Sequence, residues 1–417
     1  MSAERLRERL ERQAPGQWEL YRKSGRSRET LISPRSRLVS TRREEGWAAR
    51  WFEGNALHFA SGSGPEELER AMEDAAAVSV SAGPRFDWPT GRNSELAAEE
   101  NLETPPDLFD ELSRMLAAES RGDARVTQLA IRRGATVERI ENARGLVVTM
   151  STPRLDGVAH ATGRRGNQSC EARVLFRWDG PPDIASVARR LCDAAVLPLS
   201  LQASPVSRGE WLLEPAVGAF LLAALAPIFH GAQTPKWINR SRFCAAGISL
   251  VDDASVDAPF DGEGTSTRRV VLVENGELRG RLRDLETAAA SGSASTGHGV
   301  RPSYRTPPAA SPRRLFFEAA DPVPPLDLLA TVRRGLFASA LTAPIRVDLE
   351  ADRYEVEFTG VSIVGGRARG PVAGGRARGR ISRLLHDIAG SATDRRFLPV
   401  PYPVGTPTLL IGRAQFE

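Results

Sequence analysis

The chain has 417 residues, more than one ordinary hydrophobic core accommodates, so its length predicts two domains. Hydrophobic residues make up 41% and charged residues 26%, which excludes a disordered or membrane-embedded chain and fits a soluble globular protein. The formal net charge is only +4, and Lys23 and Lys236 are the only lysines, so nearly all of the positive charge is arginine. That bias is weak evidence for nucleic-acid binding.

The first residues and the most apolar run bear on where the protein works. The opening MSAERLRERLERQ is charged and amphipathic, and it lacks the apolar core of a secretory signal. Residues 211–231, WLLEPAVGAFLLAALAPIFHG, contain a glutamate and a proline that leave too few apolar residues to span a bilayer. The three cysteines are far apart and form no CxxC, which argues against a disulfide framework or a cysteine zinc site. They are Cys170, Cys192 and Cys244. We therefore expect a cytoplasmic protein.

The first hundred residues predict strands between short helices. Leu6 and Leu10 mark the buried face of a helix, and alternation of side chains over residues 18–42 is typical of strands. Residues 45–62 predict a hairpin that turns at Glu53–Asn55, followed by a helix from about residue 65 that Ser63 caps. A Pro- and acid-rich connector, residues 94–107, leads to a helix near Leu108–Ala118.

Five strand-like runs follow from Arg125 and are spaced like an antiparallel meander. They cover residues 126–133, 135–142, 145–152, 154–163 and 170–178. A helix over residues 183–201 closes this half, and the linker at residues 203–210 contains a proline and a glycine. We therefore expect an N-terminal domain of residues 1–204 and a C-terminal domain of residues 205–417.

The second half is richer in β-like segments. The apolar run 211–231 predicts a helix with His230 near its end, and Asn275-Gly276 predicts a tight hairpin. Further expected elements are helices near Pro325–Gly335 and Ile381–Ala389, and strands over residues 343–350 and 353–360. The predicted fold class is α+β. It combines an N-terminal α/β domain, whose mixed sheet is largely antiparallel, with a C-terminal domain that is mostly antiparallel β with a few helices.

Catalytic motifs are scarce. A helical zinc site needs two histidines three to five residues apart, and no two of the five histidines are near each other in sequence. These are His58, His160, His230, His298 and His386. A metal site assembled from distant residues stays open. There is no GxSxG elbow, and no cysteine has the setting of a nucleophile.

A glycine loop with two carboxylates, FDGEGTSTRR, spans Phe260–Arg269. Asp261 and Glu263 are suited to acid–base chemistry or to holding a cation. The alternative, which we favour from the residues alone, is that Asp261 organises the turn and Glu263 pairs with Arg268 or Arg269.

A second glycine-rich loop, SASTGHGVR, contains His298 and Arg301. Its backbone N–H groups are suited to an anion or a peptide carboxylate, and the alternative is a simple connector. Because this loop is close in sequence to FDGEG, both loops are candidates to line one cleft.

The hexamer GGRARG occurs at residues 365–370 and again at residues 374–379. With Arg380, the repeat places five arginines within sixteen residues, which fits a phosphate-binding surface. No aromatic residue is interleaved for base stacking. Since the hexamers flank Pro371–Val372, we favour two edges of a solvated hairpin.

FDGEGTSTRRVVLVENGELRGRLRDLETAAASGSASTGHGVR resembles the signature region of the TldD/PmbA family, also called TldD/TldE or "modulator of DNA gyrase" proteins. That family has an FD-x-EG loop, an ENG hairpin, an alanine-bearing segment and an STG loop. The matching residues here are Phe260, Asp261, Glu263, Gly264, Glu274, Asn275, Gly276, Ser295, Thr296 and Gly297. Similarity also covers residues 45–77, 328–341 and 404–412, so nearly the whole chain resembles the family in order.

The family resemblance implies one of two branches. One branch is a zinc metallopeptidase with an HExxxH helix and a C-terminal cysteine, and the other lacks these ligands and is the partner in a heterodimer. The segment LLAALAPI places Ala223 at the first His, Ala224 at the Glu and Ile228 at the second His, with His230 two residues beyond. The last cysteine is Cys244, far from the C terminus. The resemblance thus implies no catalytic residue and no metal in this chain, and zinc in a TldD-type partner.

The leading hypothesis is a noncatalytic PmbA/TldE-like subunit of a zinc metalloprotease complex that degrades or processes unfolded proteins and peptides. On this hypothesis the two loops are cavity or interface elements, through Phe260, Asp261, Glu263, Gly264, Thr296, Gly297, His298 and Arg301. One alternative is a stand-alone homodimer that binds peptides without cutting them. Another is a nucleic-acid or gyrase-associated modulator, which rests on the GGRARG repeat alone.

Overall fold

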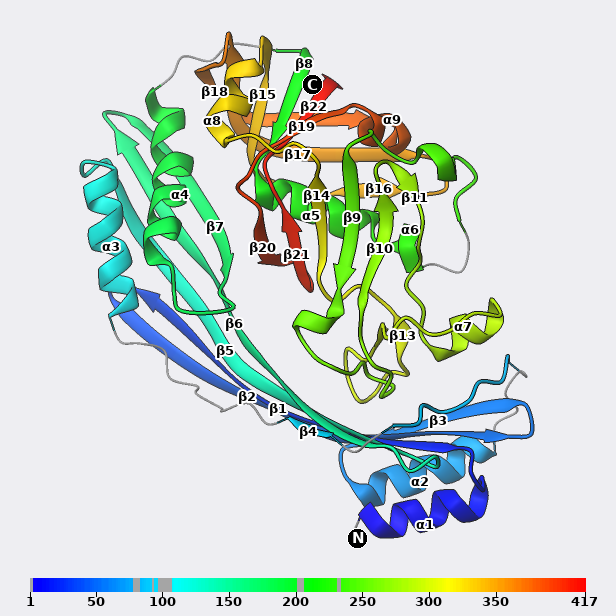
Figure 1. Ribbon diagram of the computed structural model, residues 1–417. Coiled ribbons are helices and arrows are strands. Elements are labelled where there is room, and N and C mark those ends of the chain that lie inside the picture. Colours follow the sequence, from blue (N-terminus) through cyan, green and yellow to red (C-terminus); the bar gives the residue numbers. More distant parts are fainter. Residues whose placement is uncertain (1–2, 78–82, 92–93, 97–106, 201–205, 231–233) are drawn as a thin grey trace.

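The computed structural model describes residues 3–77, 83–91, 94–96, 107–200, 206–230 and 234–417 (Figure 1). Within this part of the chain, a long curved sheet from the N-terminal half lies beside two sheets from the C-terminal half. The predicted boundary between residues 204 and 205 lies outside the described residues, as does most of the predicted connector 94–107, so the domain division stays a prediction.

The N-terminal sheet has the order β3-β2-β1-β5-β6-β4, and β7 also pairs with β6. Its strands pair antiparallel except for β4 with β6. The strands are β1 (Trp18–Ser33), β2 (Ser36–Glu53), β3 (Ala56–Gly62), β4 (Ser94–Leu96), β5 (Ala124–Asn142), β6 (Val147–Arg165) and β7 (Gln168–Arg177). The helices are α1 (Ala3–Gln13), α2 (Pro65–Ala76), α3 (Leu108–Glu119) and α4 (Ile184–Val196), followed by the 3-10 turn Leu197–Ser200.

Helices cover the two ends of this sheet (Figure 1). At one end α1 buries Leu6 and Leu10, as predicted, and α2 buries Leu68 and Met72 against the sheet. At the other end α3 and α4 pack on β5, β6 and β7. The amphipathic faces of these helices are therefore what closes the N-terminal core.

Three N-terminal predictions need correction. Residues 126–133 and 135–142 were expected as separate strands, but both belong to β5, because Gly134 sits within the ladder opposite Ser27 and does not break it. Residues 145–152 and 154–163 were also expected as separate strands, but both lie mainly on β6, because Pro153 stays within the ladder opposite Ala135. Ser63 was expected to cap α2, but Gly64 is the N-cap. The backbone N–H and the hydroxyl of Ser63 instead both donate to the Glu67 carboxylate.

The C-terminal half contains a seven-stranded and a six-stranded sheet. The first has the order β16-β17-β15-β8-β22-β19, with β18 paired to β17, and the second has the order β11-β10-β9-β14-β21-β20. Parallel pairing is confined, among the described strands of these two sheets, to β15 with β8 and β14 with β21. The mixed, antiparallel-rich α+β fold is therefore as predicted.

The strands of this half are β8 (Arg208–Leu213), β9 (Ile248–Asp253), β10 (Arg269–Glu274), β11 (Glu277–Leu278), β12 (Gly299–Val300), β13 (Ala309–Ala310), β14 (Leu315–Ala319), β15 (Arg334–Leu341), β16 (Arg346–Asp348), β17 (Arg353–Val364), β18 (Arg367–Gly379), β19 (Ile388–Ser391), β20 (Arg396–Pro399), β21 (Pro403–Thr406) and β22 (Leu409–Gln415). The helices are α5 (Pro215–Leu225), α6 (Pro227–His230), α7 (Leu285–Ala290), α8 (Pro325–Thr331) and α9 (Ile381–His386). Short 3-10 turns occur at Arg240–Arg242 and Ala254–Val256.

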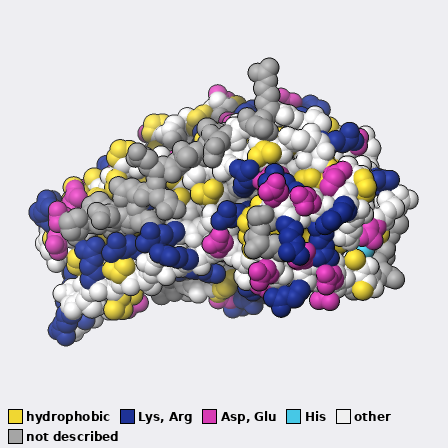
Figure 2. Space-filling view, turned by 90° about the horizontal axis from the view of Figure 1, so that it is seen from below, with side chains coloured by type: hydrophobic (Ala, Val, Ile, Leu, Met, Phe, Trp, Pro, Cys, Tyr) yellow, Lys and Arg dark blue, Asp and Glu magenta, His cyan; other side chains and the backbone are white. Residues whose placement is uncertain are grey.

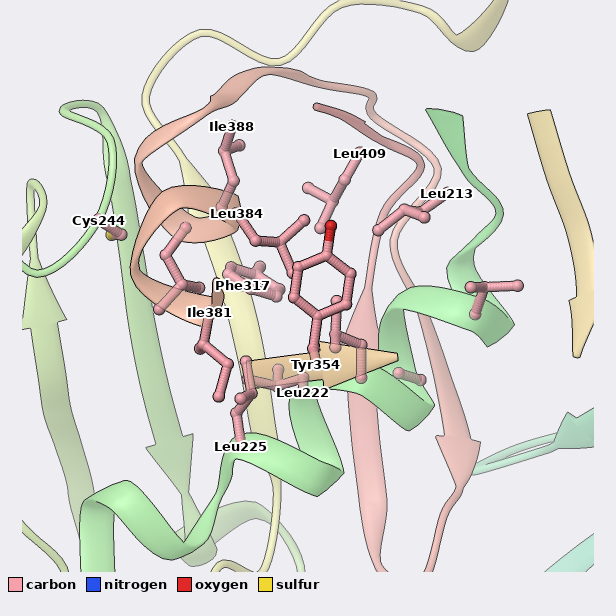
Figure 3. Packing of buried hydrophobic residues seen from close by; sticks show 14 of the residues in the cluster. Leu213, Leu222, Leu225, Cys244, Phe317, Tyr354, Ile381, Leu384, Ile388 and Leu409 are labelled. Carbon is pink, nitrogen blue, oxygen red and sulfur yellow. The ribbon is translucent and has the colours of Figure 1, made fainter. Parts of the chain in front are cut away.

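The core of this half is built around α5. Figure 3 shows Leu222 and Leu225 of α5 pointing toward Tyr354 of β17 and toward Ile381 and Leu384 of α9. Because α5 is apolar on nearly every face, it is a buried helix and not an amphipathic surface helix. None of the described helices is both long enough and apolar enough to cross a membrane.

Several predicted boundaries in this half were wrong. Trp211–Leu213 belong to β8 and not to a helix, because a continuous apolar run also suits a central strand, and β8 lies between β15 and β22. The helix expected over Pro325–Gly335 ends at Thr331, and that expected over Ile381–Ala389 ends at His386.

The GGRARG copies were expected on two edges of one hairpin. Gly365 and Gly366 instead form the turn, and the rest of the first copy and the whole second copy lie on the single strand β18, paired with β17.

Candidate functional site

A cavity of about 940 Å³ lies beside α5, where α4 and β7 of the N-terminal half meet β8, β15 and α8 of the C-terminal half. Its wall is mainly apolar, with side chains such as Leu175, Leu212, Phe220, Phe337 and Ile363. A concave, apolar site of this size between two parts of a chain is the usual form of a ligand-binding pocket.

Helix α5 supplies one wall of this cavity. The Glu214 carboxylate accepts from the backbone N–H of Ala216 at 2.5 Å, and Pro215 occupies the first turn, where its missing N–H costs nothing. Pro227 begins α6 after a break at Ala226. The capping carboxylate of Glu214 and the two prolines, Pro215 and Pro227, therefore set the two ends of α5, and all three can be read from the sequence.

The positions that the family resemblance assigns to HExxxH differ in their surroundings. Ala223 and Ala224 line the cavity, whereas Ile228 is 1% exposed and packs in the core. His230 is half-buried at the end of α6, and burial, together with the charge of Arg281, lowers its pKa.

The residues beside α5 do not fit a zinc ion. Ala223 and Ala224 present methyl groups, and no histidine or cysteine is among the residues that line the cavity. Of its three carboxylates, Glu214 pairs with Arg396 and Asp394 accepts from the backbone N–H and hydroxyl of Thr408. Across the described residues, His, Cys, Asp and Glu form no group of three that is arranged to hold a metal.

Three arginines that sequence reasoning missed lie on the cavity wall: Arg173, which is exposed, and the partly buried Arg190 and Arg396. Arg190 of α4 donates from Nη1 to the Leu175 carbonyl at 3.0 Å, and Arg396 of β20 pairs with Glu214. Burial, and then the charge of Arg396, lowers the pKa of Arg190 to about 10. Arg190 and Arg396 are 206 positions apart in the sequence and belong to no motif, so no local pattern could have paired them.

The FDGEG and STGHG loops meet in a buried cluster away from this cavity. Asp261 Oδ1 accepts from the backbone N–H groups of Glu263 and Thr265, both at 2.9 Å, and Oδ2 accepts from that of Gly299 at 2.8 Å. The side chain thus organises its own turn and also ties it to the second loop.

Glu263 was expected to pair with Arg268 or Arg269, and this was wrong. Its Oε1 accepts from Arg50 Nη1 of strand β2 at 2.9 Å, and its Oε2 accepts from the backbone N–H of Leu285 at 2.8 Å. Arg268 donates to the Ser295 carbonyl and Arg269 pairs with Glu318. The carboxylate therefore joins the two halves of the chain.

The second loop is held as tightly. Both ring nitrogens of His298 are engaged: Nδ1 lies 2.8 Å from the Thr296 carbonyl and Nε2 lies 3.0 Å from Asp252 Oδ1. Arg301 donates from Nε to the Gly262 carbonyl at 2.7 Å and pairs with Glu19 of β1. The Thr296 hydroxyl accepts from the Arg283 N–H at 2.7 Å.

Two glycines in these loops have conformations and surroundings that exclude other residues. Gly264 has φ +76°, and a Cβ there would lie 2.5 Å from Leu146 Cδ2 on the N-terminal side. Gly297 has φ +72°, and a Cβ there would lie 2.3 Å from the Ser266 carbonyl oxygen. Phe260 packs with side chains of β1 and β5, including Tyr21 and Ile140. The loops thus dock directly on the N-terminal sheet.

Charge in this cluster is unbalanced. It contains three buried carboxylates and two buried guanidinium groups: Glu19, Asp261, Glu263, Arg50 and Arg301. Burial raises the pKa of Asp261 and, with the neighbouring carboxylates, that of Glu263. None of the eight motif residues from Phe260 to Arg301 lines the cavity beside α5, and their role at a partner interface stays a prediction.

The chain is similar to a known protein family, to solved structures and to proteins of related sequence. Residues 211–417 match the PmbA/TldA metallopeptidase C-terminal domain. The C-terminal half of the chain belongs to this family of domains. TldE from Thermococcus kodakarensis, a solved structure of this fold, aligns with a TM-score of 0.85 at 18% sequence identity, covering 99% of both chains.

Curated relatives in sequence are distant and partial. A protein named metalloprotease from Methanothermobacter thermautotrophicus is 24% identical over 279 residues, which is 61% of this chain and 60% of that protein. An uncharacterised protein from Methanocaldococcus jannaschii is 33% identical over 111 residues, 25% of this chain and 26% of that protein. The chain therefore spans less than two thirds of either relative.

Proposed function

We propose that this chain is a noncatalytic, TldE-like member of the TldD/PmbA family. It pairs with a TldD-type zinc metalloprotease in the cytoplasm and helps form the chamber in which unfolded proteins and peptides are cut. The observation that carries the proposal is the identity of the α5 residues on the cavity wall. Ala223 and Ala224 stand at the family positions of a zinc-binding His and of the catalytic Glu.

The chemistry of amide hydrolysis supports a noncatalytic role. A zinc peptidase polarises the scissile carbonyl, lowers the pKa of the attacking water and transfers its proton to a glutamate. Methyl groups do none of these things, and Ile228, at the second His position, is buried in the core. What the cavity retains is an apolar wall with a few charged groups, which is suited to holding a chain and not to cutting it.

The test compares the chain alone with the chain and a TldD-type partner. The purified chain is expected to hold no stoichiometric zinc by metal analysis and to leave an unfolded protein substrate intact. Co-expression with an HExxxH homologue is expected to give a stable complex that cleaves the substrate faster than the homologue does alone. Stoichiometric zinc and peptide cleavage by the isolated chain would overturn the proposal, and so would a homodimer that ignores the partner.

The nucleic-acid alternative has less support from the structure. Figure 2 shows bands of Lys and Arg side chains on one face, with Asp and Glu side chains among them over part of it. In the GGRARG strand, Arg376 pairs with Glu355 and Glu357, and Arg378 pairs with Glu417. Arginines that are already paired gain less from phosphate groups. Salt-dependent DNA binding by the purified chain would revive this alternative.

A further inference from the structure

Arg396, which lines the cavity, has one donor without a hydrogen-bond partner among the described residues. Its Nη2 pairs with Glu214, but its Nε is buried and has no hydrogen-bond partner among the described residues. A buried N–H without an acceptor is costly, so such a group commonly marks a place where a ligand or an ordered water supplies the acceptor.

Arg190 offers a second cation on the same wall. Among the described residues, its guanidinium donates to the carbonyl oxygens of Leu175 at 3.0 Å and of Ser186 at 3.3 Å, and it forms no ion pair with a carboxylate. The lowered pKa of Arg190, caused by burial and by Arg396, means that a nearby anion would be favourable there.

Both arginines line the cavity next to β7. Leu175 lies on β7, and β20, which carries Arg396, packs against the same strand. The three acids on the cavity wall offer Arg190 little compensation. Glu214 and Asp394 are already engaged, and burial, followed by the charge of Glu119, raises the pKa of Asp193 and so weakens it as a counter-ion.

The rest of the wall is mainly apolar, although it includes the exposed Arg173, and the cavity has a volume of about 940 Å³, so the ligand is expected to combine apolar groups with one anionic end. We propose that the cavity binds the C-terminal carboxylate of an apolar peptide between Arg190 and Arg396. Two donors in a partly dehydrated setting form strong, charge-assisted hydrogen bonds to a carboxylate. This proposal rests on the proposed function for its choice of a peptide, and it adds which end of the peptide is held.

The test measures peptide binding by the isolated full-length chain. Calorimetric titration with N-acetyl-Leu-Leu-Phe, as its free acid and as its C-terminal amide, is carried out in the presence of a metal chelator. The acid is expected to bind about tenfold more tightly than the amide. Arg190→Gln is expected to abolish that preference, whereas Arg189→Gln, an exposed neighbour on α4 outside the cavity wall, should keep it.

A second variant separates a loss of peptide binding from a loss of folding. Arg396→Lys retains a cation beside Glu214 but lacks the Nε donor, so it is expected to weaken the acid preference while the unfolding midpoint stays close to wild type. Decanoate tests a fatty acid in place of a peptide.

Several results overturn the inference. These are equal binding of acid and amide, no binding of either, an equal loss in Arg189→Gln, or tighter binding of decanoate than of the peptide acid. This binding experiment needs neither zinc nor a partner. Peptide binding can therefore be absent while the chain still stimulates a TldD-type protease, and peptide binding can be present while that stimulation is absent.

Discussion

Replacing Arg50 with methionine tests whether the buried ion cluster joins the two halves. Arg50 is 2% exposed and makes three hydrogen bonds, two to Glu19 at 3.1 and 2.8 Å and one to Glu263 at 2.9 Å. Methionine removes the cation and leaves both carboxylates buried. Glu19 keeps Arg301, whereas Glu263 keeps only the backbone N–H of Leu285. Breaking a buried ion pair in this way costs about 3–5 kcal/mol.

The cost of Arg50→Met should depend on pH. Burial raises the pKa of Glu263 above its ordinary value of 4.5, and loss of Arg50 raises it further. A carboxyl with a raised pKa in the folded state stabilises the fold most below the pKa of the unfolded chain, and that stability is lost as the pH rises. Wild-type Glu263 already keeps its proton up to a pKa of about 8, so the cost of Arg50→Met should be nearly constant below pH 8 and grow above it, by up to about 1.4 kcal/mol per pH unit.

The assay is urea unfolding followed by tryptophan fluorescence at pH 9.5 and pH 7. Arg269→Met is the matched control, because Arg269 pairs with Glu318 at 2.8 Å with side chains 45% and 39% exposed. An exposed pair of this kind contributes about 0.2–1 kcal/mol. A loss below about 1 kcal/mol in Arg50→Met at pH 9.5, or a loss of the same size at both pH values, would refute the reasoning.

Three further predictions concern the same loops and the cavity. In wild type, stability is expected to fall as pH rises above 4.5 because folded Glu263 holds its proton longer than the unfolded chain does; Glu263→Gln should make that fall shallower in urea titrations, and an unchanged slope would contradict it. Gly264→Ala should cost about 1–3 kcal/mol beyond Gly54→Ala, since both have positive φ but only Gly264 would place its Cβ against Leu146; equal thermal shifts would count against this. Ala224→Trp should project an indole ring into the cavity, reduce the space for a ligand and weaken peptide binding roughly tenfold with little change in the unfolding midpoint, and unaltered binding would place the peptide elsewhere.

Part of the fold could be predicted because it depends on local chemistry. Asn275-Gly276 predicts its hairpin because both residues tolerate positive φ, and they have φ +46° and +84°. Leu6 and Leu10 predict a buried helix face through their spacing alone. The meander over residues 126–178 was likewise predicted, although its strands are longer than expected. Such features need only neighbours in the chain.

The candidate site divides in the same way. Asp261 was correctly expected to organise its turn, because the carboxylate and the N–H groups that it accepts from are within four residues. The alanines at the metal positions were also visible in the sequence, through the family resemblance. The location of Ala223 and Ala224 on a cavity wall was not, because that wall also needs α4 and β7 from the other half of the chain.

The sequence by itself determined the turns, the amphipathic helices and the absence of metal-ligand side chains at the α5 positions, since each depends on residue identity and short spacing. Only the tertiary structure decided the partner of Glu263, which is Arg50, 213 positions away, and the placement of Arg190 and Arg396 on one cavity wall. Arginine is abundant in this chain, so composition offers many equally suitable partners for each carboxylate. Arg50 is selected because the long curved sheet packs against the C-terminal loops. This packing brings Arg50 and Glu263 together away from water.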